Sequence, residues 1–322
     1  MNLINQSAEV WKQGYTLADI WEHIARCTRV CYQTEKRNDG ETGEEFCRRT
    51  ILKNEPLNSP KNHLTMLEHG TIYLRYITKW TGNSFVEKYR NNPYSKVHNV
   101  AIPENNKNYK SYDGWVQDEF YITTNLRVLV ENNWLDDLKY LSAPTKAHFK
   151  RYTVSCITNI GVSREFNHHR VHSIAEESTR YCNYNKRNDG QIKIGLPVWL
   201  DNDECVPYIE HHQYDAISTY CEEILNDNND ITPECWCDMD FYLFSITIAE
   251  WCYNALIKKG WKPQQAREVL PLATKTQLIH TAFIDDWDKF LALRYEGISG
   301  TPHPNMKALA KLIKDELDKI VE

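Results

Sequence analysis

The segment 164–181 constrains this 322-residue chain more than any other, because it concentrates arginine and histidine in a chain whose net charge is negative. It reads Arg-Glu-Phe-Asn-His-His-Arg-Val-His-Ser-Ile-Ala-Glu-Glu-Ser-Thr-Arg-Tyr and contains three arginines and three histidines. The whole chain has a formal net charge of −6, so bulk composition does not explain this cluster. Guanidinium groups bind phosphate and planar, oxygen-rich rings with fixed two-point geometry. The segment therefore predicts an anion site of the kind that holds a nucleotide.

The predicted secondary structure favours an α+β fold. Apolar residues at helical spacing predict helices at 17–29, 126–133, 214–226, 240–258, 275–294 and 305–321, and a short helix that begins at Pro263. Segments rich in β-branched and aromatic residues predict strands at 71–77, 121–124 and 151–159. The stretches 33–64, 91–115 and 183–205 resemble loops, the first with room for one short helix. Helices outnumber strands and do not alternate with them regularly, which argues against a doubly wound α/β fold.

Composition and motifs exclude several classes of protein. The negative net charge argues against binding to a nucleic-acid polymer, which requires a basic face. The most apolar stretch, 241–257, is interrupted by polar residues and is too polar to span a bilayer. The ten cysteines form no CxxC pair, and the N-terminus lacks the order of a secretion signal. We therefore expect a cytoplasmic protein with free thiols, no membrane contact and no nucleic-acid partner.

Two ordinary interpretations of the charged segment remain open at this point. Ser173 and Glu176 have the spacing of a helix capping box, and Glu176 and Arg180 have that of an i,i+4 ion pair on an exposed helix. A metal site built from His168, His169 and His172 is a second alternative. The neighbouring arginines would repel a cation, however, and no HExxH motif is present, so we predict no metal ligands.

The chain resembles the flavin-dependent thymidylate synthases in four ordered elements. His168-His169-Arg170 followed after seven residues by Ser178 is similar to the RHRx7S signature of that family. Upstream, Glu68-His69-Gly70-Thr71 resembles the family's Glu-His strand entry. Downstream, residues 265–271 resemble its Ala-Arg-x-x-Leu-Pro element and residues 290–294 its Phe-Leu-x-Leu-Arg element. Their common order makes the resemblance specific.

The resemblance implies a fold, an assembly and a reaction. It implies one domain over residues 1–322 with a mixed central sheet flanked by helices, assembled into homotetramers whose active sites are shared between subunits. It implies conversion of dUMP to dTMP, with methylenetetrahydrofolate as carbon donor and FAD with NADPH as the redox system. It also implies that the flavin mediates the redox chemistry and that no enzyme cysteine attacks the pyrimidine, in agreement with cysteines that have no evident activating partner.

Site residues follow from the same resemblance, position by position. The flavin-binding positions are His69, Thr71, His168, His169, Arg170 and Glu176. The dUMP-binding positions are Glu165, Glu176, Ser178, Arg180, Arg267 and Arg294. Of these, Ser178 and Arg294 are the catalytic candidates. Arg180 and Arg267 are expected at the phosphate, and Arg294 at the N3/O2 edge of the pyrimidine, where a guanidinium stabilises developing negative charge.

The chain also departs from the family pattern. His168 stands where the signature has an arginine, and Phe283-Ile-Asp285-Asp286 stands where polar flavin contacts are usual. Residues 79–150 are interpreted as an insertion or a subfamily elaboration. No G-x-G-x-x-G motif is present, so any flavin must be held by side chains. Two alternatives follow: an inactive nucleotide-binding relative without flavin, and a metal-dependent hydrolase built on the histidines.

Overall fold

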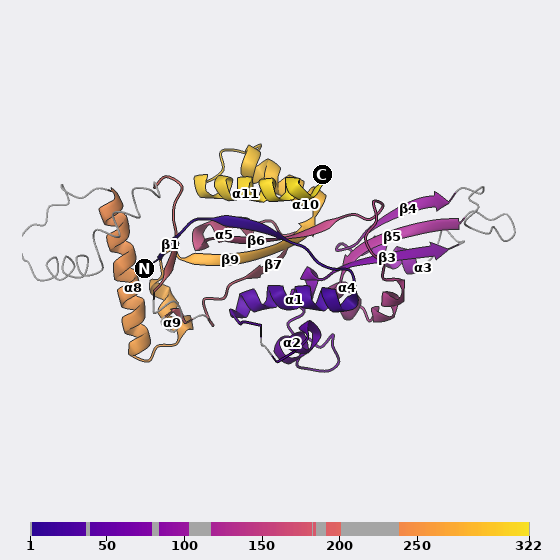
Figure 1. Ribbon diagram of the computed structural model, residues 1–322, viewed down its shortest axis with the longest axis horizontal. Helices are drawn as coiled ribbons and strands as arrows, with labels where there is room; N and C mark the ends of the chain where they lie inside the picture. The colour runs from indigo at the N-terminus through magenta and orange to yellow at the C-terminus, as the bar shows by residue number, and fades with distance from the viewer. Residues whose placement is uncertain are drawn as a thin grey trace, which may run out of the picture.

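The computed structural model describes residues 2–36, 39–78, 84–102, 117–181, 183–184, 191–200 and 238–321. The predicted helix 214–226 and the Asp189-Gly190 turn within the predicted loop 183–205 lie outside these residues. The described elements follow one long axis, with a three-stranded sheet at one end, α8 (Asp238–Lys258) at the other and a four-stranded sheet between them (Figure 1).

The central sheet joins strands that are far apart in the sequence. Its order is β2 (Ser7–Trp11), β6 (Arg151–Asn159), β9 (Lys275–Phe283) and β7 (Ser173–Glu176). All of its pairings are antiparallel, and β6 pairs with β9 over its whole length. Parallel pairing occurs between β1 (Asn2–Ile4) and β8 (Lys193–Gly195). The described fold is therefore α+β, as predicted, but its central sheet is antiparallel rather than mixed, because the parallel pair forms a separate two-stranded sheet.

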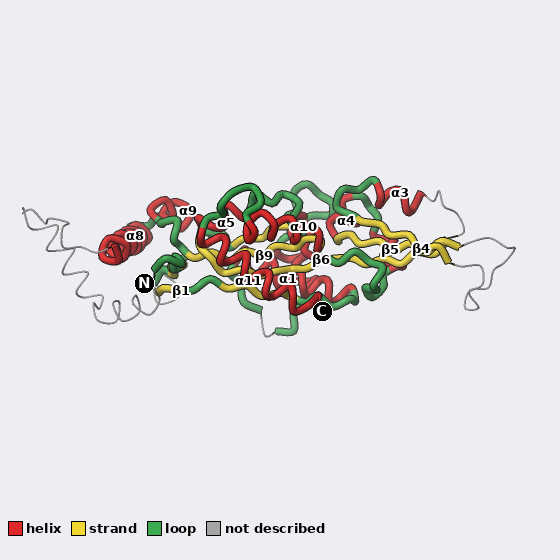
Figure 2. The backbone as a smooth tube through the Cα atoms, turned by 90° about the horizontal axis from the view of Figure 1, so that it is seen from above, coloured by secondary structure: helices red, strands yellow, loops and turns green. Residues whose placement is uncertain are grey.

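Helices cover both faces of this sheet. On one face lies α1 (Leu17–Tyr32), and on the other lie α5 (Ile160–Phe166), α10 (Ile284–Leu291) and α11 (Pro304–Val321) (Figure 1). Viewed from above, α10 and α11 cross over the strands (Figure 2). Ile279 packs in the core beneath α1, whereas Leu278 packs in the core beneath α11. The sheet is thus a shared wall between two apolar cores.

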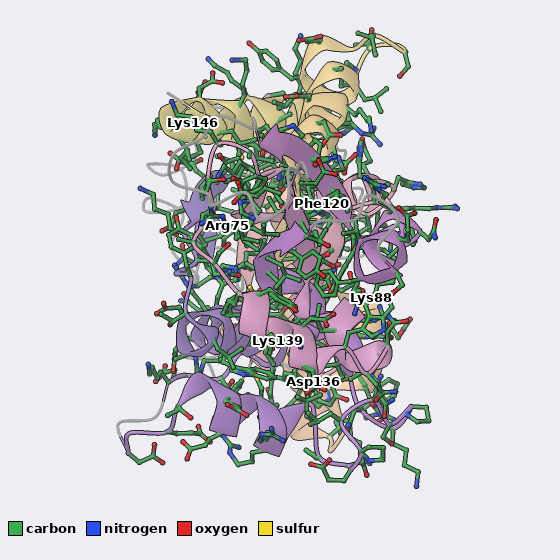
Figure 3. All side chains as sticks on the ribbon, turned by 90° about the vertical axis from the view of Figure 1, so that its right-hand side faces the viewer. Arg75, Lys88, Phe120, Asp136, Lys139 and Lys146 are labelled. Atoms are coloured by element: carbon green, nitrogen blue, oxygen red, sulfur yellow. The ribbon has the colours of Figure 1, made fainter. Side chains whose placement is uncertain are left out.

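Residues 79–150, interpreted above as an insertion, contribute side chains to the core beneath α1. Their elements include α3 (Ser84–Arg90), β4 (Lys96–Ile102), β5 (Gln117–Asn125), α4 (Leu126–Glu131) and η2 (Leu135–Tyr140). Strands β4 and β5 form a sheet with β3 (Thr71–Thr78), in the order β3-β5-β4. Figure 3 shows this end of the molecule, where Lys88 lies beside η2 and its Nζ is 2.5 Å from the Asp137 carboxylate. The predicted loop 91–115 is therefore wrong at 96–102.

The remaining elements are short. They are α2 (Gly43–Thr50), η1 (Leu64–His69), α9 (Pro263–Ala266), η6 (Arg267–Val269) and η7 (Ala292–Glu296). The predicted helices at 17–29, 240–258 and 305–321 are confirmed, as is the helix that begins at Pro263. Among the described residues no helix is both long and apolar enough to cross a membrane.

Two further predictions of secondary structure are wrong. The helix predicted at 275–294 is strand β9 followed by α10 and η7. Residues 278–283 are buried throughout because helices cover both sheet faces, and a strand buried on both faces lacks the alternation that would distinguish it from a helix. The capping box at Ser173–Glu176 is strand β7, so Glu176 and Arg180 do not form a pair along one helix.

The core beneath α11 predicts how much the free energy of unfolding falls when one buried side chain is shortened. Ile313 of α11 is fully buried in it, against Val154 and Leu278 in the same cluster. Replacement of Ile313 by Ala should lower the free energy of unfolding by about 2–5 kcal/mol, because the cavity cannot collapse completely. Urea titration followed by circular dichroism measures this change. The exposed neighbour Lys311 should tolerate the same substitution, and equal losses at both positions would contradict the assigned core.

Candidate active site

The charged segment changes structure three times along its length. It begins in α5, where the Asn159 side chain caps the helix by accepting a hydrogen bond from the Val162 amide at 2.9 Å. It then turns through 167–172 and enters β7. Beyond β7, the Glu177 amide donates to the Gln277 carbonyl at 2.9 Å and the Ser178 amide to the Cys31 carbonyl at 3.2 Å. The end of the segment is therefore held between β9 and the C-terminus of α1.

Three of the predicted residues meet around one guanidinium group. Arg294, from η7, donates from Nε to His169 Nε2 at 3.1 Å, from Nη1 to the Glu165 carboxylate at 3.3 Å and from Nη2 to the Glu165 carbonyl at 3.1 Å. His169 must accept from Arg294 and is therefore neutral. Burial and the adjacent Arg294 lower the pKa of His169 to about 4. The guanidinium is held in one orientation with N–H groups to spare.

Three other predicted residues line a pocket of about 480 Å³, which we call the 176–181 pocket. Glu176, Ser178 and Arg180 come from β7 and the loop after it, and Arg180 is exposed. The opposite wall comes from the end of α1 and from residues 50–63. The pocket thus combines a carboxylate, a hydroxyl and a guanidinium, which suits a ligand with both hydrogen-bonding and anionic groups.

Further side chains contact the residues that line this pocket or the loop between them. Asn167 Nδ2 donates to one Glu176 carboxylate oxygen at 3.1 Å, and Thr276 Oγ1 donates to the other at 3.1 Å. Arg267 Nη1 donates to Thr179 Oγ1 at 3.1 Å, which places Arg267 against the loop that carries Ser178. Sequence reasoning missed Asn167. Only its position two residues after Glu165 and within the charged segment would have suggested it.

His69 and Thr71 lie inside the protein. His69 Nδ1 is 2.8 Å from Thr281 Oγ1, which is 2.7 Å from Thr153 Oγ1. Thr71 Oγ1 accepts from Arg151 at 3.3 Å. Both predicted residues are buried, and burial is the main cause that lowers the pKa of His69 to about 3. His69 and Thr71 therefore support the central sheet next to β7. Thr281, the hydrogen-bond partner of His69, is paired in register with Ser173 of β7.

The remaining histidines of the segment differ in environment. His168 and Arg170 are exposed, and their side chains make no hydrogen bond or ion pair with the part of the chain that the structure describes. His172 is buried, with its ring 4.6 Å from that of Trp287 and its Nδ1 3.3 Å from Nδ1 of His280. The described residues contain no group of three or more His, Cys, Asp or Glu residues arranged to hold a metal ion.

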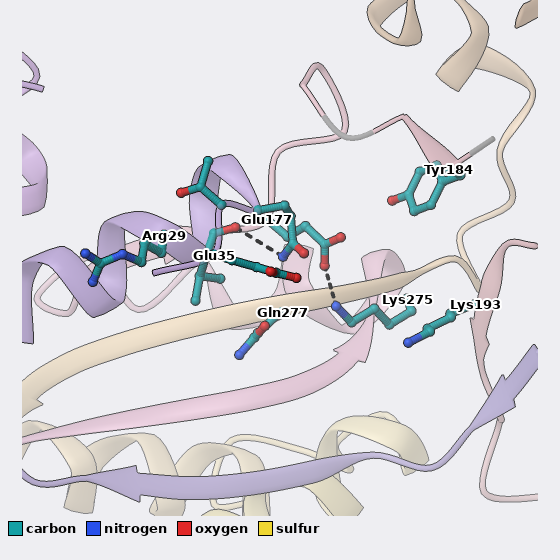
Figure 4. A pocket seen from close by; sticks show the side chains of 10 residues that line it. Arg29, Glu35, Glu177, Tyr184, Lys193, Lys275 and Gln277 are labelled. Carbon is teal, nitrogen blue, oxygen red and sulfur yellow. Dashed lines mark hydrogen bonds and ion pairs between the residues drawn. The ribbon is translucent and has the colours of Figure 1, made fainter. Parts of the chain in front are cut away.

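A larger pocket of about 830 Å³ is lined by Glu177, the residue between Glu176 and Ser178 of the 176–181 pocket (Figure 4). Glu177 and Lys275 form an ion pair in it with an N–O distance of 2.5 Å. Lys193 and Tyr184 also line this pocket. None of these four residues was predicted, because only the fold brings β8 and β9 to the loop.

The described cysteines agree with the prediction of free thiols. Cys27, Cys31, Cys47, Cys156 and Cys252 are all free. Cys31 lines the 176–181 pocket, but burial raises its pKa to about 11. The thiol is therefore protonated at neutral pH and is a poor nucleophile.

One departure from the family pattern has a structural explanation. The Asp285 carboxylate, at a position where flavin contacts were expected to be polar, forms an ion pair with Lys96 of β4 at 2.5 Å. Lys96 also lies 4.3 Å from the Phe283 ring centre. The segment 79–150 therefore contacts the position at which the sequence departs from the family.

Comparison with known proteins identifies the family. Residues 131–321 match the family model described as thymidylate synthase complementing protein. The chain belongs to this family, the flavin-dependent thymidylate synthases. The predicted resemblance is confirmed over these residues, whereas the Glu68–Thr71 element precedes them. The family assigns the chain to thymidylate synthesis in general.

Solved structures similar to this chain include two of the UMP/dUMP methylase PolB from Streptomyces cacaoi. The complex with 5-Br dUMP has a TM-score of 0.35 and 19% sequence identity, and covers 52% of this chain and 67% of that chain. The complex with 5-Br UMP has a TM-score of 0.34 and 17% identity, and covers 52% and 69% respectively. Among curated proteins none matches this chain.

The buried imidazoles predict how stability depends on pH. His69, His169 and His172 have folded-state pKa values of about 3, 4 and 3, against 6.5 for an unperturbed histidine. The unfolded chain therefore binds more protons between pH 4 and 6.5, and stability should fall as the pH is lowered through this window. Urea midpoints at several pH values measure the slope. His169→Gln should reduce the slope while keeping an acceptor for Arg294, and an unchanged slope would contradict the assigned protonation.

Proposed function

We propose that this protein catalyses the reductive methylation of dUMP to dTMP, with methylenetetrahydrofolate as carbon donor and FAD with NADPH as the redox system. Family membership supports the reaction class. The observation that carries the proposal for this chain is that Glu176, Ser178 and Arg180, all expected to bind dUMP, line one pocket. A homotetramer in the cytoplasm is part of the same proposal.

The arginines have distinct roles in this proposal. Arg180 lines the pocket and Arg267 contacts the adjacent loop, so both can approach the phosphate of a nucleotide bound there. Arg294 is held by Glu165 and His169 and keeps N–H groups free for the pyrimidine edge. A fixed guanidinium stabilises the negative charge that develops on the ring without reorganising during the reaction. Each charge-assisted hydrogen bond of this kind contributes roughly 1.5–3 kcal/mol.

The residues present fit a flavin in part. His168 and Arg170 are exposed and without partners in the described part of the chain, so both can hold a phosphate-bearing cofactor. His69 and Thr71 are buried and bonded to Thr281 and Arg151, so we assign them to support of the sheet rather than to direct contact. When bound, FAD supplies the redox chemistry of the reaction. Glu176 lies between these residues and the nucleotide loop in the sequence and accepts from Asn167.

An inactive nucleotide-binding relative is the second candidate. It is favoured by His168 in place of an arginine, and by Asp285, whose carboxylate is already engaged in an ion pair with Lys96. Absorbance of the purified protein and tritium release from C5-labelled dUMP, with and without added FAD, separate the two candidates. The proposal expects flavin bands and FAD-dependent release. Binding of dUMP without either signal would favour the inactive relative.

Arg294 provides a residue-level test. Its replacement by Ala should lower dTMP formation at least about 100-fold, because the oriented donor at the pyrimidine is lost, while bound flavin remains visible by absorbance. The matched control is Arg164→Ala, since Arg164 is an exposed arginine of α5 without a hydrogen bond or ion pair among the described residues. Turnover of Arg294→Ala near that of the control would refute the assigned role.

A further inference from the structure

We propose that Lys53 and Lys61, from the loop between α2 and η1, complete the phosphate-binding end of the 176–181 pocket. Both residues line the pocket together with Arg180. They precede residues 131–321, the part of the chain that the family model matches. The proposal rests on the proposed function, because it concerns how this chain holds the same nucleotide.

The loop is built to bring the two lysines together. The His63 amide donates to the Ile51 carbonyl at 2.8 Å, which closes the loop at its base. Asn62 is buried, and its Oδ1 accepts from the Asn54 amide at 2.9 Å while its Nδ2 donates to the Asn54 carbonyl at 2.7 Å. Lys53 and Lys61 are the residues directly before Asn54 and Asn62. The clamp therefore fixes both lysine backbones at the pocket wall.

The cationic side chains that line the pocket form no ion pair with the described residues. The side chains of Lys53, Lys61 and Arg180 make no hydrogen bond or ion pair with the residues that the structure describes. Among the residues that line the pocket, Glu176 supplies the one carboxylate, and its two oxygens already accept from Asn167 and Thr276. Three cations and one carboxylate leave an excess of two positive charges in the pocket lining, which repel each other unless an anion binds between them. A phosphate monoester, which carries nearly two negative charges at neutral pH, satisfies this requirement.

Aromatic rings favour a nucleotide over a simple anion. The ring centres of Tyr32 and Tyr181 are 5.7 Å apart, and both residues line the pocket. The Tyr32 hydroxyl is 3.3 Å from His63 Nδ1, so the loop also positions this ring. A base can pack against aromatic faces while its phosphate meets the cations. The combination matches a nucleoside monophosphate.

The test compares binding of dUMP to the purified full-length protein by isothermal titration calorimetry. Because exposed lysines contribute little individually, both are replaced, and Lys53→Ala/Lys61→Ala should raise the Kd for dUMP about tenfold or more. The matched control is Lys146→Ala/Lys307→Ala, which removes two exposed lysines that have no described side-chain partner. The control should bind like the wild type. Lys53→Arg/Lys61→Arg, which keeps the charges, should retain most of the affinity.

Binding of deoxyuridine shows whether the double alanine variant has lost only the phosphate contact or the whole nucleotide pocket. Ligand-observed NMR at millimolar concentrations should show the same deoxyuridine binding for the wild type and the double alanine variant, because the nucleoside has no phosphate. Equal dUMP affinity in all variants would overturn the proposal while leaving the proposed function intact. Loss of deoxyuridine binding together with dUMP binding would also overturn it. A wild-type protein that binds no dUMP would instead refute the proposed function.

Discussion

The site depends on the pairing of β7 with β9. In this register Ser173 faces Thr281 and Glu176 faces Leu278, so the charged segment becomes the edge of the central sheet. The chain leaves that edge through bonds from Glu177 to Gln277 and from Ser178 to Cys31. The pairing holds Ser173–Glu176 along β9, and the contacts of Glu177 and Ser178 then hold the following loop between β9 and α1. The position of the proposed anion-binding loop at the sheet edge is therefore set by a backbone ladder and not by the charged residues themselves.

Burial gives the histidines and arginines different tasks. Neutral imidazoles, such as those of His69 and His172, can pack inside the cores because burial lowers their pKa values to about 3. Arginine remains charged, so Arg294 and Arg267 lie where oxygen acceptors are available. His169 links the buried histidines to the charged arginines, since its neutral ring accepts a hydrogen bond from Arg294. The cationic appearance of the sequence thus overstates the charge of the folded segment.

Much of the fold was predictable from the sequence, but parts of the site were not. Helices with a single apolar face, such as α1 and α11, were evident from their periodicity. Strand β9 was not, because its buried residues continue into the apolar positions of α10 and imitate one helix. The motif residues Glu176, Ser178 and Arg180 meet as the resemblance implied. Asn167 and Lys53 carry no motif, and only tertiary contacts bring them to the site.

The central claim is that a nucleoside monophosphate binds in the 176–181 pocket. A crystal structure of the protein in complex with dUMP, with neighbouring subunits included, tests it most directly. We expect the phosphate within hydrogen-bonding distance of Arg180, the base near Tyr181, and Arg294 of one subunit at the pyrimidine edge. Nucleotide density at another location, with the pocket empty or closed by a neighbouring subunit, would contradict the account.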